Sequence, residues 1–167
     1  MADPLRLRIQ QGLTAVLQSI TPANGYAFDL SGPGQVARGR LLFGEGDPKT
    51  MVTMLEPPEP PEPTRDAPDQ APKAHPVWDL LLQGTTEYDH QNPTDPAYRL
   101  LADVQRRLSE ERAKLGGPMP GEAFGIPTNE LIGFSMSQGI VRPVERPVDA
   151  AFFWLPIRFS IVERYGQ

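Results

Sequence analysis

Few side chains of this sequence have the chemistry of a catalytic or metal site. The only histidines are His75 and His90, so a Ser-His-Asp site would have to use one of them. Asp89, His90 and Asp95 together offer the oxygen and nitrogen ligands that could hold a metal ion. Asp95, however, precedes a proline at a predicted helix start, where we expect it to act as the cap. The residues before it are typical of a turn, so neither site is expected.

The other motifs with possible chemistry are incomplete. Gly44 and Gly46 form a fragment of a phosphate-binding loop, without the Lys-Ser/Thr pair and the helix that should follow. No pair of carboxylates has a recognisable catalytic spacing. The chain has no cysteine, which excludes disulfides, thiolate catalysis and zinc-thiolate sites. We therefore expect a protein that is not an enzyme and that holds no metal or cofactor.

The charge distribution argues against a protein that binds nucleic acid. The net charge is -5, and the segment from Glu56 to His75 carries five acidic and two basic residues of this total. The remainder is close to neutral and shows no basic stripe, which phosphate binding would need. The longest apolar run, Ala150 to Ile157, is too short to cross a bilayer, and no signal peptide is evident. We expect a soluble protein without an export signal.

The length of 167 residues predicts one domain, 1–167. Within it, residues 56–76 form an acidic, proline-rich segment that begins EPPEPPEP. Such a sequence cannot donate a regular hydrogen-bond ladder and favours an extended polyproline conformation. We predict a semi-rigid arm, inserted between two strands and outside the hydrophobic core.

Two helices are predicted from apolar residues at helical spacing. The first runs from about Pro4 to Ile20, and the second from about Pro96 to Leu115. The apolar face of the second consists of Ala97, Leu100, Leu101, Val104 and Leu108. Its opposite face mixes acidic and basic residues, which favours a surface exposed to solvent or to another subunit over a DNA-binding surface.

Alternating and continuous apolar runs predict the strands. The predicted strands are Tyr26–Leu30, Val36–Phe43, Met51–Leu55, a strand from Val77, Leu131–Arg142 and Ala150–Arg164. The last one should bury the face of Phe153, Leu155, Ile157, Phe159 and Ile161. Phe152, Trp154 and Arg158 then share the other face, and we predict that these three contact a second subunit or partner. Pro156 lacks a ladder donor, which predicts a sheet edge or a bulge there.

The order of these elements does not alternate strictly between strand and helix. Short turns join several neighbours, as in antiparallel sheets. The predicted fold class is α+β: a mainly antiparallel β-sheet with two helices packed on one face, plus the proline-rich extended loop. This arrangement leaves the second face of the sheet free for a partner.

Five short motifs, in this order and spacing, give the chain a resemblance to a known family. They are Ile20–Tyr26 (ITPANGY), Trp78–Gly84 (WDLLLQG), Asn92–Tyr98 (NPTDPAY), Leu101–Val104 (LADV) and Ala151–Leu155 (AFFWL). Together they resemble tail terminator proteins, the minor tail or tail completion proteins of long-tailed bacteriophages. The similarity spans nearly the whole chain, and the acidic arm departs from the family's compact pattern.

The resemblance implies a structural virion protein. Members of this family are small α+β subunits that form a hexameric ring on the tail tube, end its polymerisation and provide the head-joining surface. The expected partners are therefore further copies of the chain, the tail tube protein below and a head-tail connector protein above. The expected location is the head-proximal end of the tail, and the host cytoplasm during assembly. DNA would pass through the ring without specific binding, which agrees with the charge of the chain.

Two other functions remain open. A head-side neck or connector protein shares small α+β architecture and ring assembly. From a different class, a small intracellular binding domain or enzyme could use the loop of residues 88–95. The first differs from the tail terminator in its position in the virion, and the second predicts a pocket with perturbed titratable groups.

Overall fold

The computed structural model describes residues 3–41, 44, 46–56, 77–142 and 150–163. The predictions for the proline-rich arm after Glu56, and for the strand end at Arg164, fall outside these residues. The described elements are α1 (Leu5–Gln18), a short 3-10 helix (Pro22–Asn24), β1 (Val36–Arg38), β2 (Met51–Leu55), β3 (Val77–Glu87), α2 (Asp95–Gly116), β4 (Leu131–Met136), β5 (Ile140–Arg142) and β6 (Ala150–Ile161).

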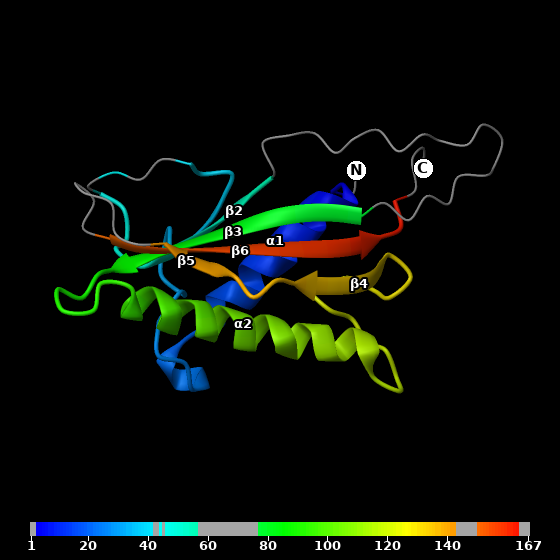
Figure 1. Cartoon of the computed structure of the whole chain (residues 1–167). Helices are drawn as coiled ribbons and strands as arrows, with labels where there is room; N and C mark the ends of the chain where they lie inside the picture. Colours follow the sequence, from blue (N-terminus) through cyan, green and yellow to red (C-terminus); the bar gives the residue numbers. More distant parts are fainter. Residues whose placement is uncertain (1–2, 42–43, 45, 57–76, 143–149, 164–167) are drawn as a thin grey trace.

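The strands form one sheet in the order β1-β2-β3-β6-β4, and β5 also pairs with β6. Strands β1 and β2 are parallel, whereas every other pairing is antiparallel. In the view of Figure 1, α2 lies below this sheet and α1 crosses behind its strands. The predicted α+β class, with a mainly antiparallel sheet and two helices, is confirmed.

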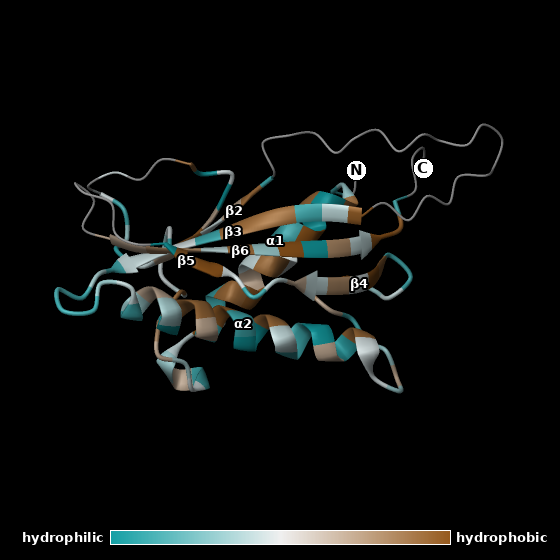
Figure 2. Cartoon of the chain, in the orientation of Figure 1, coloured by the Kyte–Doolittle hydropathy of each residue, from teal (hydrophilic) through white to brown (hydrophobic). Residues whose placement is uncertain are grey.

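A single hydrophobic core lies between the helices and one face of the sheet. From α1 it takes Ile9, Leu13, Val16 and Leu17, and from α2 it takes Leu100, Leu101, Val104 and Leu108. The predicted apolar face of α2 is thus buried, and Figure 2 shows how hydropathy changes from residue to residue along this helix. Because both helices contact the same core, the opposite sheet face has no helix of the described chain against it.

The long pairing of β3 with β6 sets which residues enter the core. It runs from Val77 opposite Ser160 to Glu87 opposite Ala150. The predicted inner row of β6 is fully or almost fully buried: Phe153, Leu155, Ile157, Phe159 and Ile161. Buried and less buried residues therefore alternate along the whole length of β6.

Gly84 of β3 leaves the space that the ring of Phe153 occupies. The two residues are directly opposite each other in the sheet. A Cβ atom on Gly84 would lie only 1.9 Å from the Phe153 ring. Because Phe153 is completely buried, the ring has no free space into which it could move, so this position requires glycine.

Helix α2 begins one residue earlier than predicted, and the predicted cap is wrong. The residue at its N-cap position is Thr94, and no side chain caps the helix there. Asp95 instead lies in the first turn, where its charge still favours the positive end of the helix dipole. Its backbone N–H donates to the carbonyl of Asn92, so the preceding turn supplies the acceptor.

The predicted strand Tyr26–Leu30 is absent from the sheet, because its backbone is bound elsewhere. The N–H groups of Ala27 and Phe28 both donate to the carboxylate of Asp103 on α2, at 2.8 and 3.0 Å. Tyr26 and Leu30 still bury their side chains. The alternating pattern therefore belongs to an extended segment bound to α2, and part of the charged face of α2 serves this contact.

Strand β1 is shorter than the predicted Val36–Phe43. It ends at Arg38, and the next residue, Gly39, has a positive φ of 69°, which turns the backbone out of the strand. Leu41, within the predicted strand, is 71% exposed. The hydroxyl of Thr53 on β2 donates to the carbonyl of Arg40, so this segment passes over β2 instead of extending β1.

The predicted strand Leu131–Arg142 is divided into β4 and β5, and Pro156 gives the reason. The carbonyl of Pro156 accepts from the N–H of Ser137, between the two strands. The N–H and carbonyl of one residue point to the same side of an antiparallel strand. An N–H at position 156 would therefore point toward this interruption, but proline has none. The predicted edge at Pro156 is wrong, since β6 is internal, but its flanking strand breaks opposite the proline.

A buried carboxylate joins α2 to the loop that follows it. Glu111 is 2% exposed and accepts the N–H of Phe124 at 2.9 Å. Its other oxygen receives hydrogen bonds from Arg107 and Lys114. Burial alone raises the pKa of Glu111, but the bonds from Lys114, the Phe124 N–H and Arg107 together hold that pKa below its ordinary value.

We predict that Gly84→Ala destabilises the chain by about 1–3 kcal/mol, because the added methyl group overpacks the Phe153 site. Denaturant melts measure the change. Gly121→Ala is the matched control, since a Cβ there has no neighbour within 4 Å. In a Phe153→Leu background the cost of Gly84→Ala should fall, and an unchanged cost would show that the two residues do not compete for space.

We also predict a pH-dependent loss in Glu111→Gln, of about 1.5–3 kcal/mol at neutral pH. The pKa of Glu111 in the folded chain lies below its ordinary value of 4.5. Its contribution is therefore fully present above about pH 4.5 and is lost as the pH falls through the folded-state pKa. Melts of both proteins between pH 7 and pH 3 should converge at the acid end, and a constant difference would contradict this assignment.

Candidate interaction surface

The face of β6 that points away from the helices carries the three residues predicted from the sequence. Phe152 and Trp154 are half-buried, and Arg158 is exposed. Pro156 lies between them and is exposed as well. The structure therefore places Phe152, Trp154 and Arg158 on one sheet face, opposite the core.

Strand β5 adds two residues that sequence reasoning missed. Ile140 and Arg142 lie opposite Trp154 and Phe152 in the sheet. The guanidinium of Arg142 stacks over the ring of Trp154, 4.5 Å from its centre, and Ile140 is 57% exposed. Arg142 belongs to no recognisable sequence motif, and only the pairing of β5 with β6 shows that it lies beside Phe152 and Trp154. Stacking of this kind holds a cation directly beside an aromatic ring.

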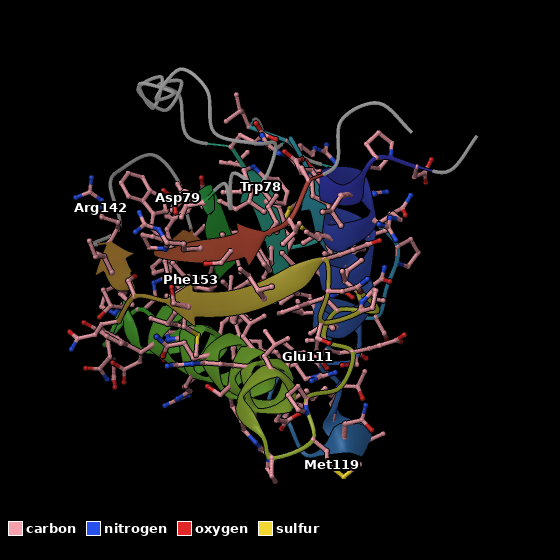
Figure 3. All side chains as sticks on the ribbon, turned by 90° about the vertical axis from the view of Figure 1, so that its right-hand side faces the viewer. Trp78, Asp79, Glu111, Met119, Arg142 and Phe153 are labelled. Atoms are coloured by element: carbon pink, nitrogen blue, oxygen red, sulfur yellow. The ribbon has the colours of Figure 1, made fainter. Side chains whose placement is uncertain are left out.

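Strand β3 contributes an ion pair to the same face. Asp79 lies opposite Arg158 and accepts two hydrogen bonds from its guanidinium, at 2.7 and 3.0 Å. This bidentate contact raises the pKa of Arg158 further above its already high ordinary value. Figure 3 shows Asp79 and Arg142 on the side of the sheet away from α2.

A shallow hollow lies beside this ion pair. It has a volume of about 520 Å³ and includes Asp79, Leu81, Ser135, Pro156 and Arg158 in its lining. Most of the surface here is apolar, with the ion pair at one side.

These residues together define what we call the outer patch. Its members are Asp79 and Leu81 of β3, Ile140 and Arg142 of β5, and Phe152, Trp154, Pro156 and Arg158 of β6. The patch combines apolar and aromatic area with two guanidinium groups, a composition common at the centre of protein interfaces.

The loop of residues 88–95 is engaged in local contacts. The carboxylate of Asp89 accepts the N–H groups of Gln91 and Asn92, both at 2.8 Å. The bond from Asn92, followed by that from Gln91, lowers the pKa of Asp89. The His90 ring packs edge-on against Tyr88. No group of acidic or histidine side chains suited to a metal ion occurs in the described part of the chain.

A second, polar hollow of about 380 Å³ lies between α2 and the segment after α1. Its charged groups already have partners within the chain. Arg107 donates to the hydroxyl of Ser19, and Glu110 accepts from the hydroxyl of Tyr26. Burial, followed by this contact with Glu110, raises the pKa of Tyr26. These bonds fix the chain after α1 against α2.

Comparison with known proteins adds no family assignment. No protein-family model matches the chain, and no curated protein matches it significantly. Neither described helix combines the length and apolar character needed to cross a membrane.

Two neighbouring residues of β6 provide a test of the two faces. Phe153→Ala should destabilise the chain by about 3–5 kcal/mol, since Phe153 is a fully buried aromatic residue. Trp154→Ala, on the outer patch, should cost no more than about 1 kcal/mol. Denaturant melts of both variants measure the difference. Equal losses would show that Trp154 supports the fold as much as Phe153 does.

Proposed function

We propose that this chain is the tail terminator of a long-tailed bacteriophage, a structural protein that closes the tail tube as a ring. In this role six copies assemble on the last ring of the tube, stop the addition of tube protein and present the surface to which the head joins. The proposal starts from the resemblance of five ordered motifs across nearly the whole chain to this family.

The observation that carries the proposal is the outer patch. It presents two aromatic side chains and two guanidinium groups on a sheet face that no described helix covers. A subunit that assembles with copies of itself needs such a surface. Such a contact buries aromatic area and needs no catalytic group. The aromatic composition of the patch agrees with this requirement.

The charge of the chain also supports this role. A net charge of -5 gives little attraction for phosphate groups. DNA that leaves the head through a ring of such subunits would not be held by the wall. The function needs passage without binding, so a basic lumen would oppose it.

The test is assembly with the tail tube protein encoded in the same genome. Without this chain we expect tubes of variable length, and with it tubes that carry a six-fold ring at the head-proximal end, seen by electron microscopy. Trp154→Ala should abolish capping while the subunit remains folded. Arg112→Ala is the matched control, because Arg112 is exposed on α2, away from the patch.

Two results would contradict the proposal. A ring of another symmetry at that position would exclude a hexameric terminator. If the chain is absent from the tail and present on the head side, it belongs with the neck or connector proteins instead.

A further inference from the structure

We infer that Met119 of one copy of this chain inserts into the apolar hollow beside the Asp79–Arg158 ion pair of a second copy. The contact joins two different surfaces of the subunit, so each copy can meet one neighbour through each surface. The inference deepens the proposed function, because it rests on the assembly of copies and names the contact between them. Neither the resemblance nor the fold class assigns a role to Met119 or to the hollow.

Met119 is the most exposed large apolar side chain in the described part of the chain. It is 90% exposed and lies in the loop between α2 and the buried residue Ala123. Single exposed apolar residues are common on protein surfaces. Here, however, the flanking residues Pro118 and Pro120 are exposed as well, so three successive residues of this loop present apolar surface to solvent.

The loop holds Met119 in a restricted position. The two flanking prolines limit the backbone, and the N–H of Gly121 donates to the carbonyl of Lys114 at 3.0 Å, which closes the loop. Further along, the N–H of Phe124 is bound by the carboxylate of Glu111. A loop that is fixed at both ends loses little conformational freedom when it binds, so less of the contact energy is lost to ordering.

The hollow on the outer patch suits a methionine side chain. Its volume is about 520 Å³, and its apolar lining includes Leu81, Met136 and Pro156. Methionine is unbranched and flexible, so it fills irregular apolar spaces that a branched side chain would not. Because the hollow is shallow, only a side chain that protrudes from its own surface can reach into it. Met119 meets this condition.

The two halves of the contact lie on opposite sides of the molecule. In Figure 3, Met119 lies beyond α2, whereas Asp79 lies on the side of the sheet away from that helix. The helix and the sheet separate them, so Met119 cannot enter the hollow of its own chain. A second copy supplies the missing half. A contact between two different surfaces repeats from copy to copy, and it forms a ring where the rotation closes.

The charges beside the two surfaces are complementary. Glu122 follows Met119 by three residues and is exposed; among the described residues it has no hydrogen-bond or ion-pair partner. On the patch, Asp79 neutralises Arg158. Arg142 stacks on an aromatic ring and contacts no carboxylate of the described chain. Attraction between Glu122 of one copy and Arg142 of the next therefore favours one orientation of the contact.

The spacing of these residues allows both contacts to form together. Arg142 lies opposite Phe152, which precedes Pro156 of the hollow by four residues on β6, or about 13 Å along the strand. The chain from Met119 to Glu122 can span up to about 10 Å. The long side chains of Glu122 and Arg142 cover the remaining distance.

Cysteine crosslinking tests the contact without the tail tube protein. The chain contains no cysteine, so every crosslink reports an engineered pair. We would mix full-length Pro120→Cys protein with full-length, affinity-tagged Ser135→Cys protein and add a short bismaleimide. Pro120 adjoins Met119, and Ser135 lines the hollow. Mixed dimers should form several-fold faster than with Arg99→Cys in place of Pro120→Cys, since Arg99 is exposed near the other end of α2.

The like pairs provide an internal control. Pro120→Cys with itself, and Ser135→Cys with itself, should crosslink no faster than the Arg99→Cys control, because the contact joins two different surfaces. The double variant, with both cysteines in one chain, should give a ladder of dimers, trimers and larger species.

Further substitutions distinguish the chemistry. Met119→Ser, added to the Pro120→Cys protein, should reduce the rate to that of the control, whereas Tyr98→Ser, at another exposed large side chain, should leave it unchanged. Glu122→Arg in one protein or Arg142→Glu in the other should slow the crosslink by up to about fivefold, the most that an exposed charge pair contributes. Both reversals together should restore most of the rate.

Two outcomes would overturn the inference. One is a mixed pair that crosslinks no faster than the control, or as fast with Met119→Ser as without it. The other is a like pair that crosslinks as fast as the mixed pair, because copies would then meet through the same surface. Since the assay lacks tube protein, a chain that crosslinks as expected but does not cap tubes would refute the proposed function alone. A chain that caps tubes but fails the crosslink would refute this contact alone.

Discussion

The fit of the Phe153 ring over Gly84 fixes the register of the two long strands, and the rest of the sheet depends on that register. Side chains alternate along a strand, so a shift of β3 or β6 by one residue would exchange the two faces of the sheet. Phe152 and Trp154 would then enter the core, and the inner row would face outward. Only glycine leaves space for a ring at this point. One missing side chain on β3 therefore decides which aromatic residues a partner can meet.

The opposite end of the core depends on Glu111. The loop after α2 contains Ala123, Phe124 and Ile126, all buried. Phe124 adopts a positive φ of 55°, which is uncommon for a residue with a side chain, and its N–H is held by the Glu111 carboxylate. Its ring packs against Phe134 and Phe159, while Gly12 of α1 lies against its backbone. The hydrogen bond from the Phe124 N–H to Glu111 thus connects α2 to a loop that also packs against α1 and the sheet.

The sequence predicts those parts of the fold whose periodicity is long and uninterrupted. Both helices, β2, β3 and the two faces of β6 follow from spacing alone, as does the shared face of Phe152, Trp154 and Arg158. The segment 26–30 was wrongly predicted as a strand because alternation does not reveal that Asp103 takes its backbone donors. Arg142 and Asp79 were missed because their partners lie across the sheet. The buried role of Glu111 also depends on a distant loop, which local spacing cannot show.

The interruption opposite Pro156 has a consequence for how copies of this chain can associate. A long, regular edge strand can pair with the same edge of another molecule and so start an open-ended fibre. Here the β4–β5 edge is divided where Pro156 withdraws its donor, and the opposite edge strand, β1, has only three residues. Within the residues that the structure describes, neither edge offers a continuous hydrogen-bond ladder. Association is thereby directed from the backbone edges to side chains on the faces, which can specify an assembly of limited size.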